Sequence, residues 1–152
     1  MKSFEDIATN DLINQEYRKS FLLNIFRKIC VKMKKDDKYK KHIKKLYLES
    51  TNKQITTILI VKDIFDYNLS DSDACLLETW LSANLRKDNK RHTISSEVKN
   101  ELYKKQKGRC AVCGEPLDTY SHVDHIIPWS LVGDELSNNY QYLCESCNES
   151  KS

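Results

Sequence analysis

The chain has 152 residues, 39% apolar and 31% charged, a balance typical of a globular protein with room for one ordinary domain or two small ones. It has no run of eighteen apolar residues, and its polar start lacks the features of a secretory signal, so we expect a cytoplasmic protein with no membrane partner. Residues 1–90 carry 18 basic and 13 acidic side chains, whereas residues 91–152 carry 7 and 9. Attraction to a polyanion is therefore expected from the N-terminal part or from local clusters.

Apolar side chains spaced three and four residues apart predict amphipathic helices in the N-terminal part. A long first helix is expected to start near Tyr17, and its apolar face comprises Phe21, Leu22, Ile25, Phe26, Ile29 and Met33. Asp36 or Asp37 can cap a second helix, because a short carboxylate accepts a hydrogen bond from a free backbone N–H of the first turn. The apolar face of this helix comprises Tyr39, Ile43, Leu46 and Tyr47.

Two further helices are predicted before residue 86. The β-branched stretch 54–61 can form a strand or a helix, and we favour a helix because the helical spacing continues to residue 67. Ser70 or Asp71 can cap the next helix, which runs to about residue 85. Cys30 and Cys75 stand alone among apolar residues, and we interpret both as small buried hydrophobic side chains.

Lysines are concentrated between Lys32 and Lys45, where eight of them stand against two aspartates. We interpret this cluster as the solvated face of two helices, with contact to nucleic-acid phosphates as the alternative. The segment 86–92 is charged and free of apolar side chains, which is typical of a linker. We therefore predict a helical domain over 1–90 and a second domain over 91–152.

The second domain is expected to mix short helices with hairpins. Ser95 or Ser96 can cap a helix over 97–106 that ends at Gly108. Helical spacing then stops, and residues 111–143 hold two glycines and two prolines between short apolar runs, a pattern typical of strands and turns. A polar helix resumes at residue 145, so the fold class expected for the whole chain is α+β.

Four of the six cysteines form two Cys-x-x-Cys pairs, Cys110 with Cys113 and Cys144 with Cys147. A disulfide scaffold needs a secreted context, and a redox motif needs one pair within a βαβ pattern, so neither fits. Two pairs supply the four thiolates of a closed tetrahedral Zn²⁺ site. We predict a structural zinc ion that supplies much of the folding free energy of this small domain.

The thirty residues between the two pairs hold Asp-His-Ile-Ile-Pro at 124–128 and Asn-Tyr-Gln at 139–141, and Asn148 and Lys151 follow the last cysteine. Together with the cysteine pairs, these motifs in this order resemble the HNH endonuclease family over residues 93–152. The resemblance implies a zinc-stapled ββα-metal fold and a metal-dependent DNA endonuclease that leaves 5′-phosphate and 3′-hydroxyl ends.

Phosphodiester hydrolysis needs a base that activates water and a cation that stabilises charge on the phosphate. His125 suits the first task because neutral imidazole is available near pH 7, and the hard carboxylate of Asp124 suits Mg²⁺ or Mn²⁺. The resemblance implies that Asn139 orients the His125 ring through its side chain or backbone, and that Asn148 is the second ligand of the catalytic cation. Adjacent residues of a regular strand point to opposite faces, so we expect a turn or bulge between Asp124 and His125.

Five neighbouring residues receive secondary assignments. Arg109 and Lys151 are candidate substrate contacts, although Lys151 is equally compatible with a solvated terminus. We interpret His122 as a surface or packing residue, because a hairpin histidine without a defined partner seldom has another role. Trp129 and Tyr140 are expected in the core of the small domain rather than as base-stacking platforms.

Two classes of function fit this sequence: a catalytic endonuclease with DNA as its partner, and a zinc-stabilised module that binds nucleic acid or protein without cutting. The set Asp124, His125, Asn139 and Asn148 discriminates between them, since a pure zinc module has no need of it. The helical part can deliver the nuclease by binding DNA, a partner protein or a second copy of the chain. Restriction, phage defence, homing and toxin activity all fit such a site.

Overall fold

The computed structural model describes residues 4–88 and 90–151, and the chain divides into two compact units, Met1–Arg86 and Lys87–Ser152. The division falls at the start of the segment expected to be a linker. That segment instead packs on the C-terminal unit, where the Lys87 ammonium donates to the Ser130 carbonyl and the His92 backbone N–H donates to Asp134 at 3.3 Å. Within the described residues, no helix is long and apolar enough to cross a membrane.

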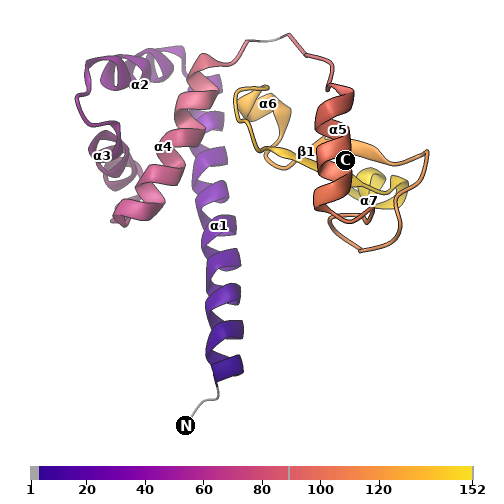
Figure 1. Ribbon diagram of the computed structural model, residues 1–152. Coiled ribbons are helices and arrows are strands. Elements are labelled where there is room, and N and C mark those ends of the chain that lie inside the picture. Colours follow the sequence, from indigo (N-terminus) through magenta and orange to yellow (C-terminus); the bar gives the residue numbers. More distant parts are fainter. Residues whose placement is uncertain (1–3, 89, 152) are drawn as a thin grey trace. The chain divides into compact units, whose positions relative to one another are not determined.

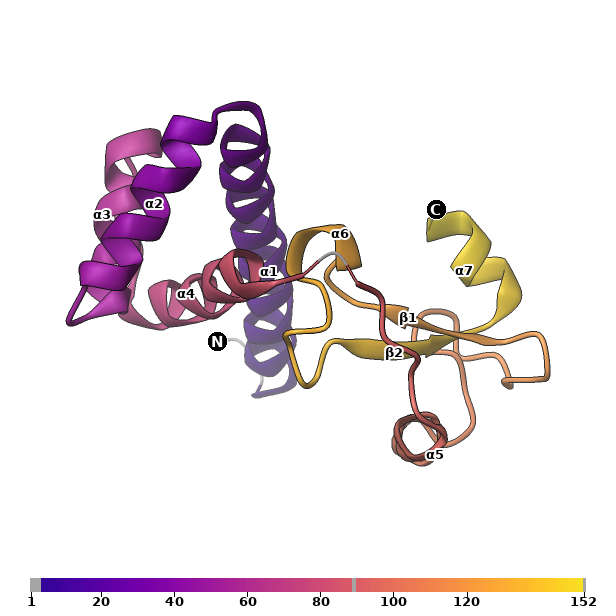
Figure 2. The same cartoon turned by 90° about the horizontal axis from the view of Figure 1, so that it is seen from above.

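Four helices form the N-terminal unit (Figure 1): α1 Phe4–Lys35, α2 Asp37–Glu49, α3 Lys53–Phe65 and α4 Asp71–Arg86. α1 starts well before the expected position and is the longest of them. Both α2 and α4 pack against α1, and α3 packs against α2 and α4 (Figure 2). Figure 1 shows that α1 extends beyond the other three helices at its N-terminal end.

Side-chain caps explain where two of these helices begin. Asp36 accepts a hydrogen bond from the Tyr39 backbone N–H at 3.2 Å, as predicted for the start of α2. Asn52 accepts from the Ile55 backbone N–H, also at 3.2 Å, and this cap starts α3 in the stretch where a strand was the alternative. The large buried side chains on the four helices are those of Leu22, Ile25, Phe26, Ile29, Met33, Ile43, Tyr47, Ile60, Val61, Leu77, Trp80 and Leu81.

The two isolated cysteines differ in burial. Cys30 is buried on α1 as expected, whereas Cys75 is exposed on α4. The buried side of α4 is set by Ala74, Leu77 and Leu81. Cys75 lies one position beyond Ala74, which turns its side chain about 100° around the helix and away from the core.

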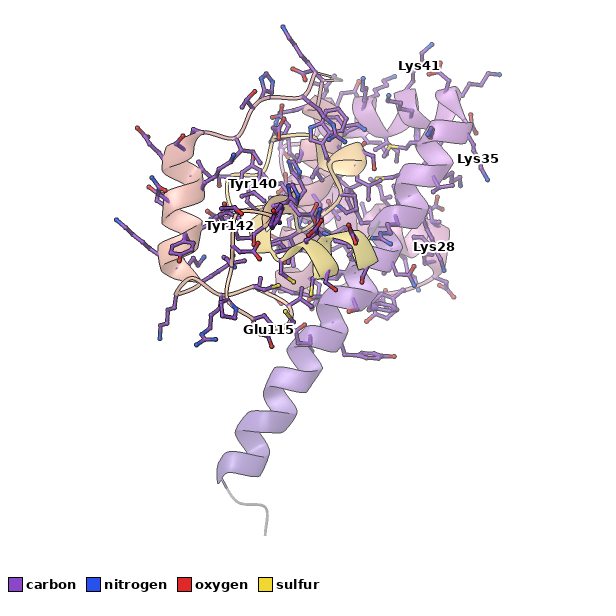
Figure 3. The ribbon with its side chains drawn as sticks, turned by 90° about the vertical axis from the view of Figure 1, so that its right-hand side faces the viewer. Lys28, Lys35, Lys41, Glu115, Tyr140 and Tyr142 are labelled. Atoms are coloured by element: carbon purple, nitrogen blue, oxygen red, sulfur yellow. The ribbon has the colours of Figure 1, made fainter. Side chains whose placement is uncertain are left out.

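The lysine cluster lies on the exposed side of α1 and α2. Figure 3 shows Lys28, Lys35 and Lys41 directed outward along one side of the N-terminal unit. Two members of the cluster have local partners: Lys41 pairs with Asp37 at 3.1 Å, and the Lys32 ammonium lies over the Tyr39 ring. The other exposed lysines of the cluster are Lys34, Lys35, Lys38, Lys44 and Lys45.

The C-terminal unit contains α5 Ser96–Lys105, β1 His122–His125, α6 Trp129–Val132, β2 Tyr140–Leu143 and α7 Glu145–Lys151. The two strands pair antiparallel, with His122 opposite Leu143 and His125 opposite Tyr140. α7 follows β2 directly and contacts both strands, which gives a ββα arrangement (Figure 2). A mostly helical chain with this small sheet confirms the α+β class.

α5 is joined to the sheet by one glutamine. The side chain of Gln106, the residue after α5, donates to the Tyr142 carbonyl at 2.9 Å and accepts from the Tyr142 backbone N–H at 2.9 Å. The chain then reverses through Lys107 and Gly108, both with positive φ, as the predicted helix end required. This double hydrogen bond holds the start of the first cysteine pair beside β2.

Candidate active site and metal centre

The four paired cysteines meet where β2 passes into α7. Cys110 and Cys113 lie in the turn after α5, Cys144 directly follows β2, and Cys147 lies in the first turn of α7. All four sulfurs lie within 4.8 Å of one another, the Sγ atoms of Cys113 and Cys144 are 3.7 Å apart, and the thiols are free. A tetrahedral Zn²⁺ with bonds of about 2.3 Å spaces its sulfurs by about 3.8 Å, so this cluster fits a zinc ion.

The pKa values of these thiols also indicate a site for a cation. Burial disfavours the Cys110 thiolate, but backbone N–H groups, with that of Cys113 first among them, lower its pKa to about 6. The neighbouring sulfurs, with Cys144 first among them, raise the pKa of Cys147 to about 12. A divalent cation supplies the charge that allows all four sulfurs to ionise together.

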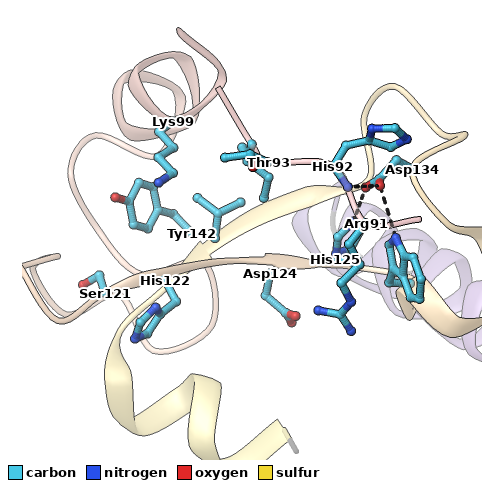
Figure 4. A pocket seen from close by; sticks show the side chains of 13 residues that line it. Arg91, His92, Thr93, Lys99, Ser121, His122, Asp124, His125, Asp134 and Tyr142 are labelled. Carbon is cyan, nitrogen blue, oxygen red and sulfur yellow. Dashed lines mark hydrogen bonds and ion pairs between the residues drawn. The ribbon is translucent and has the colours of Figure 1, made fainter. Parts of the chain in front are cut away.

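Asp124 and His125 are the last two residues of β1 and pair in regular register with Gln141 and Tyr140. The expected turn or bulge between them is therefore absent, and the turn begins only at Ile126. Because the strand is regular, the two side chains leave it on opposite sides. Asp124 contacts Lys151 of α7. His125 contacts Asp134 in the segment after α6 (Figure 4).

Two clefts meet at this end of β1. The smaller, of about 290 Å³, brings together four residues that the sequence singled out: Asp124, His125, Asn148 and Lys151. The larger, of about 320 Å³, lies along the other side of the strand and is the one drawn in Figure 4. Both clefts are lined by Asp124, His125, Trp129 and Arg91.

The residue that contacts the His125 ring most closely is Asp134, to which the sequence assigned no role. His125 Nε2 lies 3.0 Å from Asp134 Oδ1. The same carboxylate accepts from Trp129 Nε1 at 3.2 Å, from the Tyr140 hydroxyl at 3.4 Å and from the His92 backbone N–H. Burial opposes its charge, but the hydrogen bonds with His125, Trp129 and His92, with His125 first among them, hold the pKa of Asp134 below its ordinary value.

Trp129 and Tyr140 therefore surround the site rather than filling a core, and both are only half-buried. The Tyr140 ring lies 5.0 Å from the His125 ring, and burial together with the Asp134 charge raises the pKa of its hydroxyl. Among the described residues of this unit, the buried side chains are those of Cys110, Ile127, Val132, Asn139 and Leu143. A core this small cannot accommodate two large aromatic side chains as well.

Asn139 is buried immediately before β2, and its hydrogen bonds go to the backbone that follows His125. Its side chain accepts from the Ile127 N–H at 2.7 Å and donates to the Ile127 carbonyl at 2.8 Å. Its carbonyl accepts from the Ile126 N–H at 2.9 Å. In the described structure Asn139 makes no hydrogen bond to the His125 ring, so it fixes the turn beyond the histidine rather than the imidazole itself.

On the other side of the strand, Asp124 faces a cation supplied by the chain. The Lys151 ammonium lies 2.5 Å from Asp124 Oδ2 and 2.5 Å from the His125 carbonyl oxygen. Asn148, one helical turn earlier on α7, is half-buried and lines the same cleft. Its helix is anchored at the second cysteine pair, so the zinc cluster and this cleft share one short element.

Two other predicted residues lie apart from the smaller cleft. The Arg109 guanidinium donates to the Gly114 carbonyl at 3.1 Å and so braces the first cysteine turn. His122 is exposed and lines only the larger cleft. Arg91, which sequence reasoning assigned to a linker, lines both clefts and stacks on Trp129, with its guanidinium carbon 4.6 Å from the ring centroid.

Comparison with known proteins identifies this segment. Residues 110–152 match the model of the HNH endonuclease family. The match confirms the resemblance from the first cysteine onward, and α5 lies outside the matched range. Neither the curated proteins nor the solved structures gave a match to the chain.

The HNH segment, residues 110–152, also has donors suited to a divalent cation. Asp124 and Asn148 line one cleft, and carboxylate and amide oxygens are donors that suit Mg²⁺ or Mn²⁺. The Lys151 ammonium lies where a metal cation bound to Asp124 would lie. Its contacts show that Asp124 and the neighbouring His125 carbonyl oxygen attract positive charge at this point.

Proposed function

We propose that the HNH segment is a metal-dependent endonuclease that hydrolyses phosphodiester bonds in DNA. The observation that carries the proposal is that Asp124, His125 and Asn148 line one cleft together with two cationic side chains, Arg91 and Lys151. A base, oxygen ligands and phosphate-binding groups are the components that this hydrolysis needs. The family match supports the same reaction class.

His125 is the base. Its imidazole takes a proton from water, the water oxygen forms a bond to phosphorus, and the bond from phosphorus to the 3′ oxygen breaks. The departing 3′ oxygen takes a proton from solvent, which leaves a 5′-phosphate and a 3′-hydroxyl. Arg91 is held by its stacking on Trp129 and has no carboxylate partner among the described residues, so its guanidinium is available to a phosphate oxygen. Asn139 keeps the turn after His125 in one conformation through its bonds to Ile127.

Asp124 and Asn148 would hold the catalytic Mg²⁺ or Mn²⁺. When bound, the cation stabilises negative charge on the phosphate and on the departing oxygen. The amide oxygen of Asn148 favours magnesium or manganese over zinc at this second site. The two metal sites therefore differ in chemistry: four sulfurs hold zinc, and oxygen ligands hold the hard cation.

Plasmid cleavage by the purified chain, with and without Mg²⁺, tests the proposal. Wild-type protein is expected to nick or cut the plasmid only with the cation, and His125→Ala is expected to lower the rate by about 10²- to 10⁴-fold, the usual contribution of a general base. DNA binding, zinc content and melting temperature should stay close to wild type. If folded His125→Ala cuts at the wild-type rate, His125 is not the base and the assignment is wrong.

A module that binds without cutting is the alternative. It predicts DNA binding that survives removal of Mg²⁺ and substitution of Asp124, with no cleavage under any condition. We further propose that the N-terminal unit delivers the nuclease to its target by binding DNA, a partner protein or a second copy of the chain. DNA binding by the whole chain and by an Arg91→Gln variant separates binding at the cleft from binding elsewhere.

A further inference from the structure

The Asp134 carboxylate has four hydrogen-bond partners gathered from separate parts of the C-terminal unit. Oδ1 faces His125 Nε2 and the Tyr140 hydroxyl, and Oδ2 faces Trp129 Nε1 and the His92 backbone N–H. Only 14% of the Asp134 side chain and 16% of the His125 side chain are exposed. Each carboxylate oxygen thus has two partners, so the group is fixed in rotation as well as in position.

This arrangement determines which nitrogen of His125 carries hydrogen. An aspartate is ordinarily ionised near neutral pH, and two of the partners of Asp134, the Trp129 indole N–H and the His92 backbone N–H, can only donate, so this group acts as an accepting carboxylate. The nitrogen 3.0 Å away, Nε2, must therefore be the N–H of the neutral ring. In the part of the chain that the structure describes, Nδ1 has no hydrogen-bond partner, so its lone pair is free.

We propose that Asp134 is the positioning residue that holds His125 as the Nε2–H tautomer and leaves Nδ1 as the nitrogen that receives the proton from water. This inference rests on the proposed nuclease function. The water oxygen uses a lone pair to bond phosphorus, the water proton goes to Nδ1, and the electron pair of the broken bond leaves with the 3′ oxygen, which then takes a proton from solvent. The imidazolium formed in this step keeps its Nε2–H on Asp134, whose negative charge stabilises it.

The division of labour with Asn139 supports this assignment. Asn139 binds the backbone of Ile126 and Ile127 and so fixes the chain after the histidine, but in the described structure it makes no hydrogen bond to the ring. Ring rotation is instead restricted by Asp134 on one nitrogen and by the tilted Tyr140 ring 5.0 Å away. One residue fixes the backbone, and another fixes the tautomer.

The tautomer can be read directly from the ¹⁵N chemical shifts of the His125 ring in the zinc-loaded full chain, at a pH high enough to keep the ring neutral. Wild type is expected to show a protonated Nε2 and a bare Nδ1. Asp134→Asn places an amide NH₂ beside Nε2, so the hydrogen should move to Nδ1 and kcat for plasmid cleavage should fall by about 10²-fold with little change in KM. Glu97→Gln, which removes one exposed charge on α5, should change neither.

A wild-type ring protonated on Nδ1 overturns the proposal, and this measurement needs no variant to fold. An unchanged tautomer in Asp134→Asn with wild-type zinc content and melting temperature also overturns it. If the shifts behave as expected but wild-type chain never cuts DNA, the nuclease function fails while Asp134 retains its role in fixing the ring. The two failures are therefore distinguishable.

Discussion

At the residue scale, Lys151 is the side chain with the most direct consequence for cation binding. Its ammonium lies against Asp124 Oδ2 and the His125 carbonyl. In the proposed function Asp124 would also hold the catalytic cation, so the ammonium and the metal ion would compete for this carboxylate. Both side chains of the pair are partly exposed, at 37% and 27%, so solvent screens the attraction and its contribution is about 1 kcal/mol or less.

Lys151→Met is therefore expected to tighten Mn²⁺ binding by about 2- to 5-fold, the factor that corresponds to a weak exposed ion pair. Calorimetric titration of the zinc-loaded chain with Mn²⁺ measures this without any cleavage. Lys104→Met, an exposed lysine of α5 away from both clefts, removes the same charge and should leave the affinity unchanged. Weaker Mn²⁺ binding by Lys151→Met would show that the ammonium assists the cation instead of competing with it.

Individual residues were predictable from the sequence where a motif defined them. Asp124, His125 and Asn148 were singled out by their order between and beyond the cysteine pairs, and the fold brings all three to one cleft. Asp134 and Arg91 carried no such signal, because their roles depend on tertiary contacts with His125 and Trp129. The sequence marks this position only by the preceding glycine, Gly133. In the structure Gly133 has a positive φ and turns the chain at the end of α6, directly before Asp134.

At the scale of elements, periodicity predicted the helices of the N-terminal unit well because each buries one apolar face. The start of α1 was placed too late because the apolar series used to predict it begins at Tyr17, whereas the helix begins at Phe4. The regular end of β1 was also unexpected, since Asp124 and His125 were assumed to need one common side. The strand instead delivers them to opposite sides, and the small cleft wraps around its end.

The lysine cluster offers a test at this scale. If the cluster is only a solvated face, replacing four of its lysines with glutamine should change the free energy of unfolding by less than about 0.5 kcal/mol. The same variant, with Lys38, Lys41, Lys44 and Lys45 replaced, should keep the DNA affinity of wild type and its salt dependence. Arg91→Gln, in the cleft, is the comparison variant that should weaken binding. If the lysine variant instead binds every sequence more weakly, with a salt slope reduced by about 0.9 per lost contact, the cluster binds phosphates.

At the scale of the whole molecule, the two units depend on different sources of stability. Among the described residues, the N-terminal unit buries a dozen large side chains along four helices, whereas the C-terminal unit buries five side chains, one of them a cysteine of the metal cluster. A unit with so small an apolar core needs an additional cross-link to be stable. The cysteine cluster provides one, because it joins the turn after α5 to the junction of β2 and α7. Loss of zinc should therefore unfold one unit and spare the other.

The two tryptophans allow this to be measured, because Trp80 lies in the N-terminal unit and Trp129 in the C-terminal one. Structural zinc contributes about 10 kcal/mol or more to folding of small domains, so a strong chelator is expected to abolish the folded-state fluorescence of Trp129, followed in a Trp80→Phe variant. The signal of Trp80, followed in Trp129→Phe, should not change.

Cys144→Ser should have the same effect as the chelator. Cys75→Ser, at an exposed cysteine outside the cluster, should retain about one zinc per chain by elemental analysis. A Trp129 signal that survives complete loss of zinc would show that the unit is held by its apolar contacts, and the cysteine cluster would then lose its structural role.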